Sequence, residues 1–175
     1  MLRDKFPNSY LYIHTEPQGV FNGFNLLRLA KAIGLPQEAL LFPQPLDYKR
    51  GFTQEELAAL YTAADVTLTT SYGEGFGLAT IESQACGTPT ITSAFAASQD
   101  LAGEDSWIIP GQPFWDEAQL AWFTIPSVPA IVQALEEAYE KRGAKSKVSR
   151  QFALDFEVEK IWQEKWLPLL KRELA

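Results

Sequence analysis

The sequence predicts an α/β protein with a mostly parallel sheet, and two observations support this class. Short runs of β-forming residues alternate with helical patterns through the N-terminal part of the chain. The stretch Asp65–Ser93 then reads as a strand, a glycine-rich turn, a short helix and a second strand, which together form one βαβ unit. Such alternation favours parallel strands joined by right-handed crossovers.

Size and composition favour one compact domain over residues 1–175. A net charge of −7 argues against a nucleic-acid partner, whose binding needs clustered Lys and Arg. The single cysteine, Cys86, excludes an intrachain disulfide and a Cys-based zinc site. The N-terminus lacks the apolar core of a signal peptide, and no run of about 18 apolar residues exists. We therefore expect a cytoplasmic location.

The elements before the βαβ unit are indicated by β-forming runs and by helix start and stop signals. They are a strand over Ser9–Thr15, a helix over Asn25–Ile33, a strand over Ala39–Phe42, a loop over Pro43–Arg50 and a helix that begins at the capping box Thr53–Glu56. We interpret Lys49 and Arg50 as a solvated pair, and His14 as structural, in preference to roles in a site.

The βαβ unit itself consists of a strand over Val66–Ser71, a helix from about Leu78 to Cys86 and a strand over Pro89–Ser93. After it the sequence indicates a helix over Ala96–Ala102, a strand over Trp107–Ile109, a long loop over Gly111–Pro126, a helix from Ser127 to near Gly143, and helices over residues 146–175. Asp155 is a candidate N-cap that divides these last helices, and Pro168 should kink or break them. Trp162 and Trp166 favour docking of the helices, either onto this domain or toward a domain outside the chain.

The turn Tyr72–Gly77 has the composition of a phosphate-binding loop. Its glycines allow a ligand to approach the backbone, and the following helix offers unpaired N–H groups carrying about half a positive charge. Glu74 projects from the turn, and Glu82 lies on the helix with its side chain leaning back toward the turn. Carboxylates would repel a phosphate but bind diols well, so the pattern diol, phosphate, diol predicts a nucleotide sugar. A glycine turn without ligand duty is the competing interpretation.

Other ligand motifs fit less well. The dinucleotide fingerprint G-x-G-x-x-G would need glycine where Leu78 stands, and neither a Walker A loop nor a G-x-S-x-G elbow is present. One His and one Cys give no support for a Cys-His dyad or a multi-His metal site. An NAD-dependent oxidoreductase remains an alternative hypothesis.

The segment GEGFGLATIESQACGTPTITS resembles the E-x7-E region of the retaining, GT-B-type glycosyltransferases of family 4, in their C-terminal, donor-binding domain. The resemblance extends over LYIHTE, GFTQEELAALYTAADV and the closing helix. It implies a Rossmann-like three-layer sandwich, the C-terminal half of a GT-B fold. It also implies a metal-independent hexosyltransferase without a cofactor, whose donor is a nucleotide-diphosphate sugar.

The resemblance assigns roles to six residues. Glu74 becomes the candidate catalytic residue, because the matching glutamate contacts the donor sugar hydroxyls. Glu82 would bind the ribose, and the turn amides would hold the diphosphate. The candidate donor-binding residues are therefore Gly75, Phe76, Gly77, Leu78 and Glu82.

Two departures from the family limit the expected activity. Members place an Arg and a Lys upstream of the strand at Ser9, and we expect these two residues to lie outside this chain. Members also have an N-terminal domain that binds the acceptor, and we expect that domain to lie outside this chain as well. Transfer needs both walls of the cleft, so we expect this chain alone to be inactive and to bind donor weakly. Peripheral membrane association of the full-length enzyme stays open. A stand-alone nucleotide or nucleotide-sugar module without transferase activity is the alternative.

Overall fold

A computed structural model of the chain describes residues 2–20 and 23–174. The chain divides into two compact units, Met1–Leu57 and Ala58–Ala175. The sequence-based expectation of one domain over residues 1–175 stays a prediction.

The first unit contains a small parallel sheet and short helices. Its elements are α1 (Leu2–Lys5), β1 (Leu11–Tyr12), α2 (Leu26–Ala32), the 3₁₀ turn η1 (Gln37–Ala39), β2 (Leu40–Leu41) and α3 (Pro45–Arg50), followed by the start of α4 (Gln54–Ala63). Leu11 pairs with Leu40 in the parallel ladder. Both strands are shorter than the sequence predicts, because only these two-residue segments lie side by side in register.

The expectation of a loop over Pro43–Arg50 is wrong, because α3 occupies Pro45–Arg50. Pro45 stands in the first turn of this helix, where its missing N–H leaves no bond unmade. Arg50 pairs with Glu56 at 2.8 Å, so its charge is compensated within the first unit. The capping box is confirmed: the Thr53 N–H donates to Glu56 Oε2 at 2.8 Å, and the Glu56 N–H donates to Thr53 Oγ1 at 3.2 Å.

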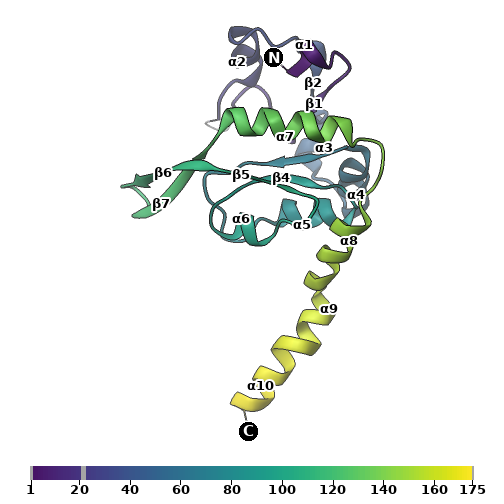
Figure 1. Cartoon of the computed structure of the whole chain (residues 1–175), viewed down its shortest axis with the longest axis vertical. Coiled ribbons are helices and arrows are strands. Elements are labelled where there is room, and N and C mark those ends of the chain that lie inside the picture. Colours follow the sequence, from purple (N-terminus) through teal and green to yellow (C-terminus); the bar gives the residue numbers. More distant parts are fainter. Residues whose placement is uncertain (1, 21–22, 175) are drawn as a thin grey trace. The chain divides into compact units, whose positions relative to one another are not determined.

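The second unit is a three-layer α/β arrangement, which confirms the predicted α/β class. Its sheet is parallel with strand order β3 (Thr67–Thr69), β4 (Thr90–Ser93), β5 (Trp107–Ile109). Figure 1 shows α7 (Val128–Glu140) on one face of this sheet and α5 (Leu78–Ala85) with α6 (Ala97–Asp100) on the other. The predicted βαβ unit therefore lies at the centre of the second unit.

The two faces of this sheet are held differently. Ile91, Ile109 and Ala134 form a buried apolar core between the sheet and α7. The α5 face is instead rich in hydroxyl groups: Thr69 Oγ1 lies 3.1 Å from Thr80 Oγ1, and Ser83 Oγ donates to Thr67 Oγ1 at 2.7 Å. Helix α5 is thus fixed to β3 by directional hydrogen bonds.

A fully buried glutamine connects α5 to the segment between α6 and β5. Gln84 Nε2 donates to the carbonyls of Thr80 and Leu101, at 3.0 and 2.7 Å, and Oε1 accepts from the Gly103 N–H at 2.8 Å. Each polar atom of this side chain is therefore satisfied, as burial requires.

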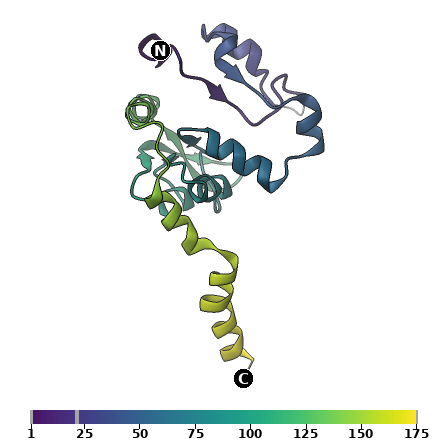
Figure 2. The same ribbon diagram turned by 90° about the vertical axis from the view of Figure 1, so that its right-hand side faces the viewer.

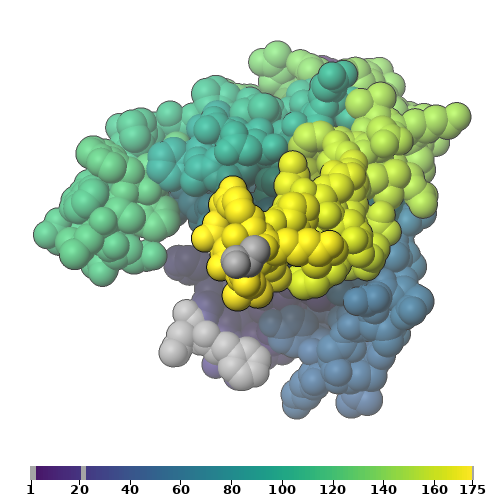
Figure 3. Space-filling model, turned by 90° about the horizontal axis from the view of Figure 1, so that it is seen from below, coloured from purple at the N-terminus to yellow at the C-terminus, as the bar shows by residue number. Residues whose placement is uncertain are grey.

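The region predicted as a loop, Gly111–Pro126, is an antiparallel hairpin, so that expectation is wrong. It is formed by β6 (Gly111–Asp116) and β7 (Ala121–Pro126), and it is the green projection at the left of Figures 1 and 3. Its four-residue connection contains no glycine, and Leu120 takes the left-handed conformation with φ 50°. Pro113, opposite Thr124, is tolerated because a proline on an edge strand can direct its missing N–H outward.

The chain ends in a run of helices, shown from a second side in Figure 2. It comprises α8 (Lys147–Ala153), a 3₁₀ turn (Leu154–Phe156), α9 (Val158–Ile161), a π-helical turn (Trp162–Trp166) and α10 (Leu167–Glu173). Asp155 is not the N-cap of α9; Glu157 holds that position, and the Asp155 carboxylate accepts from Lys160 at 2.5 Å. Pro168 does not break the run, because it stands in the first turn of α10, after the π-helical turn. Within residues 2–20 and 23–174, no helix is both long and apolar enough to cross a bilayer.

We expect Gln84→Leu to lower the free energy of unfolding by about 2–4 kcal/mol, because it leaves the Leu101 carbonyl and the Gly103 N–H buried without partners. Urea denaturation of the purified chain measures this difference. Gln151→Leu on α8 is the control, since that side chain is exposed. Equal transition midpoints for Gln84→Leu and the parent chain would show that this amide does not hold α5.

Candidate functional site

The predicted site residues lie on one continuous segment of the second unit. Glu74, Gly75, Phe76 and Gly77 occupy the connection between β3 and α5, and Glu82 lies on α5 itself. This connection leaves the carboxyl end of β3. Ligands of open parallel sheets bind beside this edge.

The three glycines of the turn serve three different purposes. Gly77 adopts a left-handed conformation, φ 97° and ψ 61°, at the N-cap of α5. Gly75 faces open space, since a side chain added there would meet nothing within 4 Å. Gly73 is packed against a side chain, because an added Cβ would lie 2.9 Å from Phe123 Cδ1. The sequence does not distinguish these three glycines, and in the structure only Gly75 leaves room for a ligand.

The turn presents a row of unpaired backbone donors. Within the part of the chain that the structure describes, the N–H groups of Gly75, Phe76, Gly77 and Leu78 form no hydrogen bond. Gly77 has no side chain that could cap α5, and the first bonded amide of the helix, that of Thr80, donates to the Gly77 carbonyl at 3.1 Å. Free N–H groups at a helix start attract anions, so this segment can hold a phosphate.

Glu74 is oriented by the ends of two strands. The Ser71 hydroxyl donates to Glu74 Oε1 at 2.6 Å, and the Ser71 carbonyl accepts from the Ser93 hydroxyl at 2.7 Å. The Glu74 side chain is half-buried. Because Ser71 follows β3 and Ser93 ends β4, the carboxylate is held at the carboxyl edge of the sheet.

Glu82 is oriented by a tyrosine of α4. The Tyr61 hydroxyl, on α4, donates to Glu82 Oε2 at 3.0 Å, although 21 positions separate the two residues. Burial of the ring raises the pKa of Tyr61, and the hydrogen bond to the Glu82 carboxylate raises it further. Tyr61 therefore remains a protonated donor. No sequence pattern could have indicated this pair, since it depends on how α4 and α5 pack.

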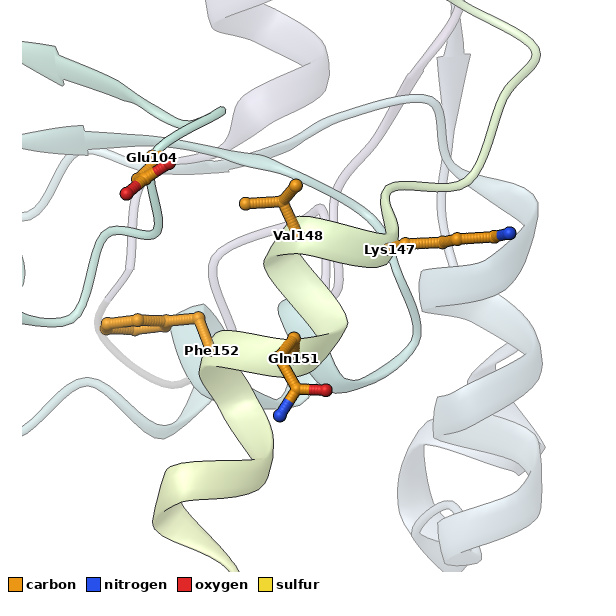
Figure 4. Close-up of a pocket in the computed structure, with 5 residues that line it drawn as sticks. All are labelled: Glu104, Lys147, Val148, Gln151 and Phe152. Atoms are coloured by element: carbon orange, nitrogen blue, oxygen red, sulfur yellow. The ribbon is translucent and has the colours of Figure 1, made fainter.

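A metal site and a pocket are two other features that the described residues could form. Within residues 2–20 and 23–174, no group of three or more His, Cys, Asp or Glu residues is arranged to hold a metal ion. An open hollow of about 470 Å³ lies beside α8. It is lined by Glu104, Lys147, Val148, Gln151 and Phe152, and Figure 4 shows Glu104 across from the four residues of α8. None of the predicted site residues lines this hollow.

Known proteins are similar to the part of the chain that contains the turn. The family model described as glycosyl transferases group 1 matches residues 47–149, which include all six predicted site residues. The chain is 40% identical over 70 residues to D-inositol 3-phosphate glycosyltransferase of Salinispora tropica, and 40% identical over 75 residues to D-inositol 3-phosphate glycosyltransferase 2 of Catenulispora acidiphila. These matches cover 40% and 43% of the chain but only 13% and 16% of the relatives.

Two solved structures share the fold. Sucrose-phosphate synthase from Thermosynechococcus elongatus matches 94% of the chain and 38% of its own length, with a TM-score of 0.64 and 26% identity. The GtfA/B complex matches 97% of the chain and 31% of its own, with a TM-score of 0.66 and 20% identity. The predicted Rossmann-like α/β fold is thereby confirmed.

Gly77 and Gly75 should differ in their tolerance of a side chain. Gly77→Ala should lower the free energy of unfolding by about 1 kcal/mol, since a strain of about 1–2 kcal/mol exceeds the about 0.4–1 kcal/mol that alanine gains through the unfolded chain. Gly75→Ala is the matched control and should leave stability unchanged or slightly raised, because its position is open. Chemical denaturation compares the two variants. Equal decreases in the free energy of unfolding of Gly77→Ala and Gly75→Ala would mean that the left-handed backbone at Gly77 does not matter for folding.

The raised pKa of Tyr61 predicts a loss of stability at alkaline pH. A pKa that is higher in the folded than in the unfolded chain contributes stability below the unfolded value, near pH 10, and this contribution is lost as the pH rises above it. The free energy of unfolding should therefore fall less steeply above about pH 10 in Tyr61→Phe than in the parent chain. Denaturation curves from pH 8 to pH 11 test this, with the exposed Tyr10 changed to Phe as control. Parallel curves for the parent chain and Tyr61→Phe would contradict the assignment.

Proposed function

Because the chain belongs to the glycosyl transferases group 1 family, we propose that it is the donor-binding half of a retaining, metal-independent hexosyltransferase with a GT-B fold. The observation that carries this proposal is the row of unpaired amides from Gly75 to Leu78, placed between two oriented carboxylates. The family assignment also favours a transferase over the NAD-dependent oxidoreductase considered from the sequence.

Each part of the turn has a role in holding the donor. The amides of Gly75, Phe76, Gly77 and Leu78 bind the diphosphate, because unpaired donors and the start of α5 are complementary to its negative charge. Glu82 accepts from the ribose hydroxyls. One of its oxygens already accepts from Tyr61, and this bond fixes the direction of the other.

Glu74 binds the hydroxyl groups of the transferred sugar. Its Oε1 accepts from Ser71, so the carboxylate keeps one orientation without a cation beside it. During transfer, the bond between the sugar and the diphosphate breaks and negative charge develops on the leaving phosphate. The turn amides are positioned to stabilise that charge, and such fixed donors contribute strongly to catalysis.

Binding of the acceptor and exclusion of water require a second wall of the cleft. In this proposal, an N-terminal domain outside this chain supplies that wall. The chain spans a small part of the curated relatives that it matches, so the substrates of the whole protein belong to this proposal. We place that protein in the cytoplasm, with the described chain inactive when isolated. Peripheral association of the whole enzyme with a membrane is compatible with this assignment.

Titration calorimetry of the chain with UDP and GDP tests the proposal. We expect weak binding of one nucleoside diphosphate and at least a tenfold loss in Glu82→Ala, because charge-assisted hydrogen bonds are worth about 1.5–3 kcal/mol each. The difference in affinity between the parent chain and Glu82→Ala should disappear with a nucleoside diphosphate whose ribose is replaced by dideoxyribose. Glu140→Ala, an exposed glutamate of α7, is the control and should bind like the parent chain. Absence of binding at millimolar nucleotide, or unchanged affinity in Glu82→Ala, would refute the proposed role.

A further inference from the structure

The β6–β7 hairpin contacts the start of the candidate site. The Thr124 N–H of β7 donates to the Tyr72 carbonyl at 2.9 Å. The Tyr72 ring meets the Phe114 ring edge-on at 5.7 Å, and Phe114 stacks on Phe123 at 5.9 Å. The hairpin therefore binds both the backbone and the side chain of the residue that opens the turn.

Gly73 shows how close this contact is. Its backbone does not have the positive φ that would demand glycine, in contrast to that of Gly77. Instead, an added Cβ would lie 2.9 Å from Phe123 Cδ1 and 3.1 Å from Phe123 Cε1. Real Cβ atoms almost never lie as close as the first distance, and the second is tighter than most Cβ contacts, so a side chain at position 73 would displace either the ring or the turn.

The hairpin is also joined closely to the end of strand β5. Only Pro110 separates β5 from β6, and the Pro110 carbonyl accepts from the Ser127 N–H, at the end of β7, at 2.8 Å. Thr124 is buried. Phe123 is thus attached to the carboxyl end of β5, while Ser71 attaches the turn to β3 and β4.

The two faces of the hairpin are distinct. The face with Phe114 and Phe123 packs on the turn. The neighbouring cross-strand pair, Trp115 and Trp122, lies on the opposite face with exposures of 45% and 59%, and its rings contact each other at 5.7 Å. Two aromatic residues, Trp122 and Phe123, therefore stand beside each other on β7, one away from the turn and one toward it.

We propose that Phe123 is a positioning residue for the diphosphate-binding amides, through its contact with Gly73. The inference rests on the proposed function of the turn. Gly73 directly precedes Glu74 and the free amides of Gly75 and Phe76, so a shift of Gly73 moves all of these groups. Loss of the ring releases the turn on the hairpin side, and displacements of about 1 Å are enough to weaken an aligned site strongly.

The test compares Phe123→Ala with Trp122→Ala, its neighbour on the other face, and with Gly73→Ala, which disturbs the same contact from the turn. UDP and uridine are the probes, titrated by ligand-observed NMR, because only UDP requires the amides. Phe123→Ala and Gly73→Ala should lower the affinity for UDP about tenfold, equivalent to about one charge-assisted hydrogen bond, and should change the affinity for uridine less than twofold. Trp122→Ala should leave both affinities unchanged, and Phe123→Leu should restore most of the affinity for UDP.

The outcomes separate the two proposals. A parent chain that binds neither UDP nor GDP overturns the proposed function, and the positioning role with it. A parent chain that binds UDP overturns the positioning role alone if Phe123→Ala matches Trp122→Ala, or if it loses UDP and uridine affinity equally, as general destabilisation would cause. If Phe123→Ala does not fold, Phe123→Val takes its place, with thermal unfolding confirming a folded chain before titration.

Discussion

Helix α5 is attached to the sheet through hydroxyl groups, and the geometry of the candidate site depends on this attachment. The apolar face of the sheet, toward α7, is stabilised by hydrophobic burial, which has no preferred direction. The pairs Thr69–Thr80 and Thr67–Ser83 are hydrogen bonds, whose narrow range of distances and angles fixes α5 along its axis. A helix that could slide would move its free N-terminal amides away from the end of β3, and these two pairs prevent that.

Neutral donors orient both carboxylates of the site. Ser71 holds Glu74 and Tyr61 holds Glu82, so each carboxylate keeps one direction. Hydroxyl partners are suited to this purpose, because an arginine or lysine would compete with sugar hydroxyls for the same oxygens. Under the proposed function, the charge of a bound diphosphate would be met by the amides of the turn.

The central βαβ unit could be predicted from sequence because its boundaries carry strong local signals. Gly87 and Pro89 end α5 and begin β4 within one residue of the expected positions. The hairpin could not be predicted, because its connection has no glycine or asparagine turn and Leu120 takes the left-handed conformation instead. The Tyr61–Glu82 pair and the Phe123–Gly73 contact join residues from different elements, and a single sequence shows no signal for such pairing. Positions in the turn were therefore predictable, while the groups that orient them were not.

The glycines of the turn illustrate why a glycine-rich motif overstates the room available to a ligand. A glycine may serve a backbone conformation, a close internal contact or an approaching ligand, and these three causes look the same in a sequence. Here Gly77 serves the first and Gly73 the second, while Gly75 faces open space, which leaves room for the third. Because the space at Gly73 is filled by a ring of the hairpin, this contact connects a segment outside the glycine-rich turn to the amides within it. Under the proposed function, variation in the aromatic face of β7 would change how the turn holds a donor, although no residue of the hairpin belongs to the E-x7-E segment.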